Sequence, residues 1–334
     1  MATKHNIKRG VSLYSFQSDY YLRRLTLEQL IARSSEMGIP GIEIIGDQMI
    51  PGYPDISTEF LHTWNAWRDH YGFIPVCLDM FLDWNKFDGR DMTDEEMLES
   101  FKRDIVNASN LGCSVIRVIH NIPHHILEKA VPTAEKYNVK LAVEVHAPHH
   151  LDSPIEQQLI QMFQKLQSPC LGFTIDMGVF TRKLPRVALQ SFVDAGMKQS
   201  IADYLAEGYE SQTLPPGEHS QELTDKVIQM GGSEKDVYNA HLGIRMIFMN
   251  PQRLLDYMPY ILHCHGKFWE MLPEYREYSI PYEEIVPVLI KGGYNGYIDS
   301  EYEGALWTAD AGEVESMEQV HRQQVMLKRL LGES

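Results

Sequence analysis

The sequence predicts an α/β protein, a (β/α)8 TIM barrel with a helical insertion between the sixth and seventh strands. Two observations lead to this fold class. Eight short runs rich in β-branched residues alternate with amphipathic stretches, and four of the runs carry an acidic or imidazole side chain near their carboxyl end. Eight parallel strands are the number that closes such a barrel, and their carboxyl ends meet at one mouth.

The predicted strands are spaced as successive βα units. The runs are GVSLYS from Gly10, GIEIIG from Gly41, FIPVCLD from Phe73, SVIRVI from Ser114, VKLAVEVH from Val139, CLGFTID from Cys170, YILHCHG from Tyr260 and YNGYIDSEY from Tyr294. Most begin about 30 residues apart, the length of one βα unit. A doubly wound open sheet is the alternative, but it would want a glycine-rich first turn, and SLYSFQSDY has none.

Helical patterns fill the gaps between these runs. They lie at about 26–37, 57–71, 93–110, 124–137, 154–167, 281–291 and 312–331. Two begin with the residues of a capping box, Thr26 with Gln29 and Thr93 with Glu96. A third begins with Ser153, which stands before a proline at the first helical position. Caps that agree with the periodicity support these boundaries.

One gap is far longer than the others. The sixth and seventh runs begin 90 residues apart, at Cys170 and Tyr260, so we expect a helical insertion at about 181–255. Long insertions in compact domains more often serve as lids or contact surfaces than as idle loops. We expect this one to contact a partner or another subunit, and the whole of 1–334 to form a single TIM-barrel domain around it.

The composition argues against several classes of protein. The 46 acidic and 30 basic residues give a net charge of −16 and leave no basic stripe, so nucleic acid is not an expected partner. The four cysteines are scattered without metal-binding or disulfide spacing. No apolar run approaches the roughly 20 residues that span a bilayer, and the amino terminus lacks the apolar segment of a secretion signal. A cytoplasmic location is the expectation.

The most informative residues are Glu144, Asp176, His265 and Glu301, each near the carboxyl end of its own predicted strand. Alone, any of them has an ordinary structural explanation, such as a solvated rim residue. Together they offer three carboxylates and one imidazole, a donor set that suits manganese, magnesium or zinc better than a thiolate-loving metal. The sequence therefore predicts a divalent-metal site in the barrel mouth.

Alternation along the strands places a second group beside three of these candidates. Side chains two residues apart share a face, so His146 accompanies Glu144, His263 accompanies the metal-ligand candidate on the seventh strand, and Glu303 accompanies Glu301. A base whose pKa is near neutrality can remove a proton next to a ketone when a cation stabilises the resulting enolate. His146 is the first choice for this base, and Glu144 the second.

Three further residues are candidates for substrate binding. Lys267 follows the seventh strand's metal-ligand candidate by two residues, while Glu43 and His120 stand at the ends of the second and fourth strands. Lys267 could hold a sugar hydroxyl or the enolate oxygen, and the other two could bind sugar hydroxyls. A solvated rim position is an equally good explanation for each. His149 is expected on the loop after the fifth strand.

The segments AVEVH, FTIDMG, HCHGK and DSEYEG resemble the sugar phosphate isomerase/epimerase superfamily, the xylose isomerase-like barrels that include D-tagatose 3-epimerase. The resemblance implies that Glu144, Asp176, His265 and Glu301 hold one divalent metal. It also favours His265 over its neighbour two residues earlier. In the epimerases the two metal-bound glutamates form the acid/base pair, so Glu144 and Glu301 are also catalytic candidates, whereas His146 is an added base.

Within that superfamily, RGVSLYSFQSDY, EVHAPHH and the long insertion resemble the alpha subunit of bacterial C-glycoside deglycosidases. This resemblance implies a lyase that cleaves the C–C glycosidic bond of 3-oxo-C-glycosides by proton abstraction and β-elimination. It further implies a small beta subunit in a hetero-oligomer. Manganese is the implied metal, with magnesium, cobalt or zinc as alternatives. The alternative function is a sugar or keto-sugar epimerase or isomerase that works through a metal-stabilised enediolate.

Two other classes fit less well. The endonuclease-IV branch of the superfamily cleaves phosphodiesters with three metals and a basic groove, which the strong acidity of this chain argues against. A noncatalytic binding module would have no use for a metal site with a base beside it.

Overall fold

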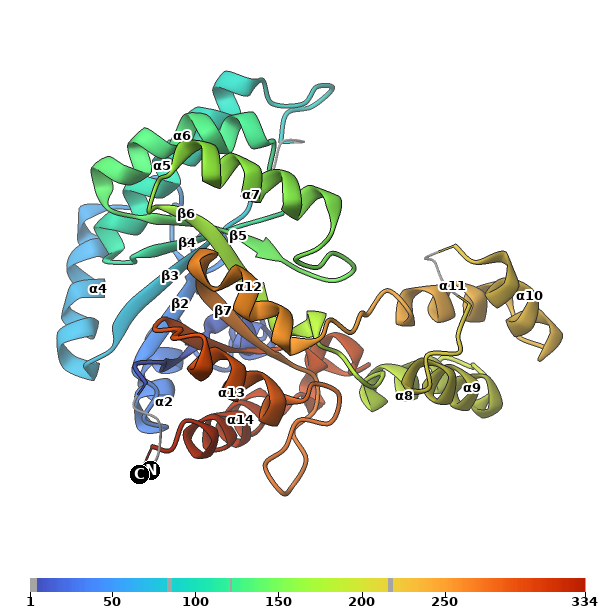
Figure 1. Ribbon diagram of the computed structural model, residues 1–334. Helices are drawn as coiled ribbons and strands as arrows, with labels where there is room; N and C mark the ends of the chain where they lie inside the picture. Colours follow the sequence, from blue (N-terminus) through green and yellow to red (C-terminus); the bar gives the residue numbers. More distant parts are fainter. Residues whose placement is uncertain (1–4, 83–85, 121, 216–218, 334) are drawn as a thin grey trace.

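The computed structural model describes residues 5–82, 86–120, 122–215 and 219–333. Eight parallel strands close into a barrel in chain order (Figure 1). They are β1 Lys8–Ser12, β2 Gly41–Ile45, β3 Ile74–Met80, β4 Val115–Val118, β5 Lys140–Val145, β6 Leu171–Asp176, β7 Ile261–Phe268 and β8 Tyr297–Tyr302. Each predicted run overlaps one of these strands, which confirms the predicted fold class.

Helices surround the barrel as the sequence patterns predict (Figure 1). The main ones are α2 Leu27–Glu36, α4 Thr58–Tyr71, α5 Asp94–Leu111, α6 His124–Tyr137, α7 Pro154–Leu166, α13 Tyr282–Lys291 and α14 Ser316–Leu330, with short α1 Gln17–Tyr21 and α3 Gly46–Met49 after the first two strands. The capping boxes at Thr26 and Thr93 both form. Ser153 differs, because its hydroxyl accepts a hydrogen bond from the backbone N–H of His150 instead of capping α7.

Short 3-10 turns complete several connections. They are η1 Leu13–Phe16, η2 Met177–Val179, η3 Pro251–Arg253, η4 Met258–Tyr260, η5 Gly304–Trp307 and η6 Ala311–Glu313. The last of these occupies the positions where the sequence pattern predicts the first turn of α14. The helix therefore begins at Ser316, four residues later than the predicted start at 312.

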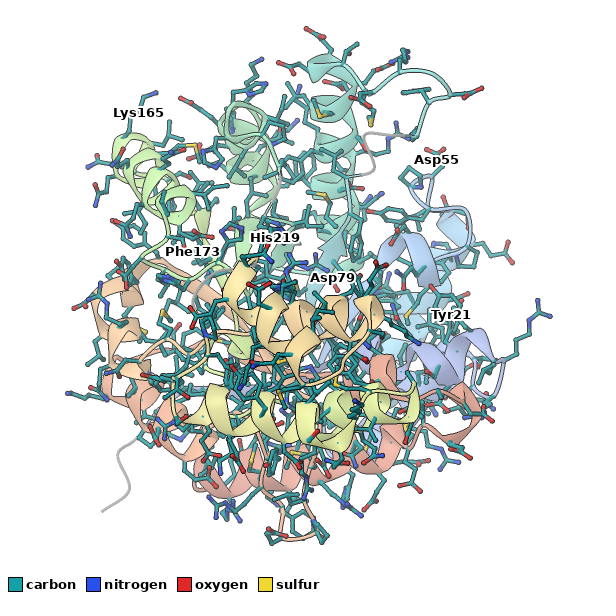
Figure 2. The ribbon with its side chains drawn as sticks, turned by 90° about the vertical axis from the view of Figure 1, so that its right-hand side faces the viewer. Tyr21, Asp55, Asp79, Lys165, Phe173 and His219 are labelled. Carbon is teal, nitrogen blue, oxygen red and sulfur yellow. The ribbon has the colours of Figure 1, made fainter. Side chains whose placement is uncertain are left out.

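Between β6 and β7 the chain forms a group of helices that stands at one end of the barrel (Figure 1). They are α8 Arg186–Asp194, α9 Gln199–Glu210, α10 Gln221–Gln229 and α11 Glu234–Gly243, whereas the short α12 Leu254–Tyr257 that follows lies against the barrel near α13 (Figure 1). Of the predicted insertion, 216–218 lie outside the described residues. In Figure 2, which views the molecule from that end, α8 to α11 lie in front of the barrel.

The insertion helices α8 to α11 have an apolar cluster of their own. Phe192, Ile201, Leu205 and Leu223 are among its buried members. The ring of Trp307, from the turn after β8, packs edge-on against Phe192 with the ring centroids 5.6 Å apart. This contact joins the insertion to the barrel next to the strand ends.

The barrel interior is unusually polar. Such barrels are usually filled by branched apolar side chains, and here the large apolar core lies around the strands, with Leu30, Phe101 and Ile116 fully buried in it. Inside the barrel, by contrast, β7 contributes a row of alternate residues, His263, His265 and Lys267, whose side chains are all nearly inaccessible to water. Burying ionisable groups is costly unless they are paired, so this interior calls for a functional explanation.

Gly172 lies where β6 packs closely against the chain that enters β7. An added Cβ would lie 2.3 Å from the carbonyl oxygen of Tyr260 and 2.6 Å from Cγ of Leu262. We therefore expect Gly172→Ala to lower the free energy of unfolding by about 1–3 kcal/mol. Chemical denaturation measures the loss. Gly243→Ala on α11 is the control, because its nearest neighbour would be 3.7 Å away; equal stability of the two variants would contradict the packing.

Candidate functional site

His265 on β7 stands at the centre of a buried cluster of metal-binding side chains. Its Nδ1 lies 2.9 Å from Oε1 of Glu144 on β5 and 3.4 Å from Oε1 of Glu301 on β8. One ligand atom from each of the three lies within 4.8 Å of the other two. Three strands that are far apart in the sequence thus bring three of the four predicted metal ligands together.

Asp176, the fourth predicted ligand, stands at the end of β6 and is joined to this trio through Lys267. The Lys267 ammonium lies 3.0 Å from Oδ2 of Asp176, 3.1 Å from Oε2 of Glu301 and 2.7 Å from Oε1 of Glu303. The other Asp176 oxygen, Oδ1, accepts a hydrogen bond from the backbone N–H of Gly178 at 2.7 Å. Asp176 is therefore held by both of its oxygens, and Oδ2 faces the Lys267 ammonium.

The donor atoms fit a divalent cation. Oδ2 of Asp176 and Oε2 of Glu301 are buried, and both contact the Lys267 ammonium, which also contacts Glu303. Buried carboxylates are costly unless cations compensate them, and a single ammonium serves three of them here. Carboxylate oxygens with one imidazole nitrogen are a donor set used by manganese, magnesium and zinc.

The three side chains of the trio shift one another's pKa values strongly. Burial raises the pKa of Glu144, but Arg117 and His265 outweigh it and hold that pKa well below its usual range. For Glu301, burial is outweighed by His265 and Lys267, so its pKa falls to about 2. Burial lowers the pKa of His265, whereas the surrounding carboxylates raise it well above its ordinary value. Both glutamates are therefore ionised, as metal ligands must be, whereas His265 has to give up a proton when a cation binds.

His146 follows β5 directly and is the most accessible of the predicted catalytic residues. Its Nδ1 lies 2.6 Å from the carbonyl oxygen of Ala147, which can only accept a hydrogen bond, so Nδ1 carries a proton. Its Nε2 lies 3.5 Å from Oδ2 of Asp176. Burial lowers the pKa of His146, but Asp176 and other carboxylates outweigh this effect and raise it.

A cavity of about 650 Å³ opens above the cluster. It is lined by His120, His146, Ala147, Pro148, His149, Asp176, Gly178, Leu242, Arg245, Met246, Lys267, Trp269, Glu303 and Trp307. Leu242 belongs to α11, and Met246 follows it, so the insertion supplies one wall while the strand ends supply the floor. A floor of charges with partly apolar walls suits a ligand that has a polar end and an apolar end.

The other predicted binding residues fall at different depths. His120 lines the cavity and its ring lies 5.5 Å from that of His149, which is on the loop after β5 as predicted. Lys267 also lines the cavity. Glu43 instead lies fully buried within β2, where Oε2 is 2.8 Å from His263 and 3.1 Å from His265. Glu43 therefore contacts the two histidines and is not among the residues that line the cavity.

An arginine inside the barrel is the main site residue that the sequence interpretation leaves out. Nε of Arg117 on β4 donates to Oδ1 of Asp79 on β3 at 2.6 Å, and its NH1 lies 3.7 Å from Oε2 of Glu144. Its guanidinium also lies over the ring of Phe81, 4.6 Å from the centroid. The sequence does carry a signal for it, since an arginine in the apolar run SVIRVI must face either the barrel interior or the helices.

Comparisons with known proteins agree with this architecture. Residues 31–183 match the family described as xylose isomerase-like TIM barrel. A solved structure of L-ribulose 3-epimerase is 11% identical and superposes with a TM-score of 0.58 over 98% of this chain and 95% of that one. The IOLI protein, solved with a bound zinc atom, is 12% identical with a TM-score of 0.57 over 98% of both chains. These structural likenesses show the fold, that of the xylose isomerase-like barrels.

Sequence similarity to named proteins identifies the family of this chain more closely. A C-glycoside deglycosidase alpha subunit from Arthrobacter globiformis is 31% identical over 98% of this chain and 93% of that protein. A 3'-dehydrocarminate deglycosidase alpha subunit from a Microbacterium species is 29% identical over 97% of this chain and 95% of that protein. The chain belongs to the family of C-glycoside deglycosidase alpha subunits.

Glu301 and Glu303 allow a matched test of the metal ligands. Both glutamates contact Lys267, but only Glu301 belongs to the trio around His265. We expect Glu301→Gln to weaken manganese binding at least about 100-fold, more than loss of a group that only supports a ligand would do. Glu303→Gln should weaken it far less. Calorimetric titration of chelator-treated protein measures both, and equal losses would indicate a general charge effect instead of ligation.

Proposed function

We propose that this protein is the alpha subunit of a divalent-metal-dependent lyase that cleaves the C–C glycosidic bond of 3-oxo-C-glycosides. The observation that carries the proposal is the 31% identity to a C-glycoside deglycosidase alpha subunit along almost the whole of both chains. The trio of Glu144, His265 and Glu301 beneath a cavity of about 650 Å³ supports it. Asp176 completes the proposed ligand set.

The reaction needs an environment that tolerates negative charge on the ketone oxygen. A divalent cation, when bound by Glu144, Asp176, His265 and Glu301, supplies positive charge for that oxygen. Manganese is the first choice, with magnesium, cobalt or zinc as alternatives. The Lys267 ammonium is the protein's own cation at this place and is assigned to the enolate oxygen or a neighbouring hydroxyl. His120, at the cavity wall, is assigned to a sugar hydroxyl.

His146 is assigned as the base that removes the proton from sugar C2. Because Nδ1 is committed to the Ala147 carbonyl oxygen, Nε2 is the nitrogen that takes up the proton. Glu144 is the second choice for this role, and Glu301 is its partner in an acid/base pair. The bond from C1 to the aglycone then breaks, and its electron pair passes to the aglycone carbon, which takes up a proton. The sugar keeps a C1=C2 double bond conjugated with the C3 ketone.

A sugar or keto-sugar epimerase or isomerase is the alternative function. The likeness of the barrel to L-ribulose 3-epimerase favours it as far as the fold can. Glu144 and Glu301 both approach the same nitrogen of His265, so they are close enough together to serve one substrate as an acid/base pair through an enediolate. The two functions share the first proton transfer and diverge at the next step.

A small beta subunit is the proposed partner, in a hetero-oligomer. The relatives are named alpha subunits, which implies a second chain. We assign the contact to the insertion, α8 to α11, or to the rim of the barrel. None of the helices in the described parts of the chain is both long enough and apolar enough to cross a membrane. A cytoplasmic location stays a prediction.

Proton NMR in deuterated water tests the reaction directly. The chain is co-expressed with the small protein encoded beside it, loaded with manganese and given a 3-oxo-C-glucoside. We expect release of the aglycone, and we expect this release to disappear in Glu301→Gln because the cation is lost. Glu99→Gln, at an exposed position on α5 outside the insertion, is the control. Deuterium at sugar C2 without aglycone release would move the function to epimerisation or isomerisation.

A further inference from the structure

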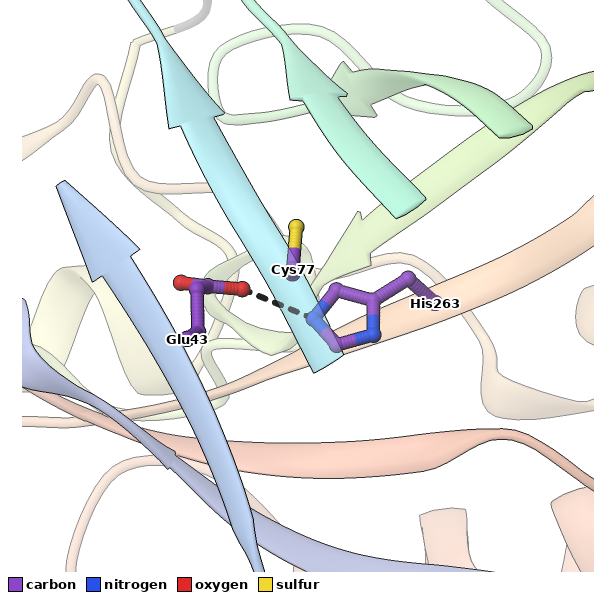
Figure 3. A group of neighbouring side chains, drawn as sticks. All are labelled: Glu43, Cys77 and His263. Carbon is purple, nitrogen blue, oxygen red and sulfur yellow. Dashed lines mark hydrogen bonds and ion pairs between the residues drawn. The ribbon is translucent and has the colours of Figure 1, made fainter. Parts of the chain in front are cut away.

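A second cluster of potential metal ligands lies one layer deeper in the barrel. Glu43 on β2, Cys77 on β3 and His263 on β7 each place one ligand atom within 4.8 Å of the other two (Figure 3). All three side chains are fully buried. Inward-facing residues on a strand are two apart, so His263 lies one step nearer the amino-terminal end of the barrel than His265.

The spacing in this deeper layer repeats that of the candidate metal centre above it. Around His265, carboxylate oxygens lie 2.9 and 3.4 Å from one ring nitrogen. Around His263, Oε2 of Glu43 lies 2.8 Å and Oδ2 of Asp299 lies 3.4 Å from Nε2. Cys77 adds a thiol, which the upper centre lacks. Two successive inward histidines on one strand therefore have the same kind of surroundings.

Several carboxylate oxygens in the deeper layer have no hydrogen-bond partner within the described residues. Glu43 and Asp299 are fully buried. Oε1 of Glu43 and Oδ1 of Asp299 have no hydrogen-bond or ion-pair partner within the described residues, and Oδ2 of Asp299 has only the 3.4 Å contact with Nε2 of His263. The bond between Glu43 and His263 satisfies only one of the four carboxylate oxygens. Two buried acceptors without a partner, and a third with one long contact, are expensive, and a cation would satisfy them together.

We propose that Glu43, Cys77, His263 and Asp299 form a second divalent-cation site, and that zinc is the ion it suits. One sulfur, one nitrogen and two oxygens from four strands match the four-coordinate, mixed-donor sites that zinc prefers. Binding releases the Cys77 thiol proton and one ring proton of His263 to solvent, since a thiolate and a neutral imidazole are the ligands. The thiolate separates this site chemically from the oxygen-rich centre at the mouth.

The deeper site has its own approach from the far end of the barrel. A cavity of about 490 Å³ is lined by residues at the amino-terminal ends of the strands, including Val76, Tyr297 and His263 itself. Lys8 and Lys140 also line it; both side chains are exposed, and Lys8 lies over the ring of Tyr297, 5.1 Å from its centroid. His263 itself is fully buried, so an ion would enter from this end only when the side chains around the cavity move.

The ion in this site has a structural role. Four protein ligands leave no position for a substrate, which is the pattern of structural zinc sites. Glu43 connects the layers, because Oε2 lies 3.1 Å from Nε2 of His265. An ion that holds Glu43 would also hold His265 with Nδ1 directed to Glu144, as outer-shell carboxylates do at other metal sites. The site does not depend on which reaction the mouth performs.

Cobalt substitution distinguishes the two sites, because only a thiolate ligand gives a sulfur-to-cobalt charge-transfer band in the near ultraviolet. We expect the chelator-treated full chain to take up about two cobalt ions and to show this band. Asp176→Asn should keep the band, since Asp176 belongs to the upper centre. Cys77→Ser should lose the band and one cobalt ion. Cys170→Ser, a buried thiol just before β6, is the control and should behave like the unaltered chain.

Two results would overturn the proposal: one cobalt ion per chain without the band in the folded protein, or a band that survives Cys77→Ser. If Cys77→Ser does not fold, X-ray absorption on zinc-loaded Asp176→Asn decides the question with the thiol intact. We expect one sulfur neighbour at about 2.3 Å from the zinc. A shell of oxygen and nitrogen atoms alone would remove the site.

Discussion

An excess of buried negative charge is the constraint on which the barrel interior depends. Its inward-facing carboxylates are Glu43, Asp79, Glu144, Asp176, Asp299, Glu301 and Glu303. Among the residues that the structure describes, Arg117 and Lys267 are permanent cations that form ion pairs with them. Buried charges are tolerated only when they are paired. Because the carboxylates outnumber these cations, they raise the pKa of His263 to about 9 and also raise the pKa of His265. A bound divalent cation relieves the same shortfall and adds a reactive centre.

The insertion adds an apolar wall to the cavity above this charged floor. Leu242 and Met246 from the insertion face a cavity that also contains Trp269 and Trp307. Trp307 connects the two parts, since it lines the cavity and packs on Phe192 of α8. A movement of the insertion would therefore change the apolar wall of the cavity, whereas the candidate metal ligands stand on the strands. This division of labour accords with a barrel family that varies its loops around constant strand ends.

The strands and the ligand candidates could be predicted from the sequence, because strand alternation and βα spacing are local properties. The distances between strands could not. The sequence pattern places Glu43 at a strand end, yet it is the third residue of β2 and lies inside the barrel. The sequence suggests a substrate contact for Lys267, whose contacts with three carboxylates depend on the register of β7 against β6 and β8. The salt bridge of Arg117 with Asp79 depends likewise on the register of β3 and β4.

Anomalous X-ray diffraction from crystals grown with manganese tests the central claim, a metal centre in the barrel mouth, most directly. The account predicts a strong anomalous peak bordered by Glu144, Asp176, His265 and Glu301, with the Lys267 ammonium displaced toward Glu303. A peak confined to carboxylates on the outer surface, with the ion pairs of Lys267 unchanged, would contradict it.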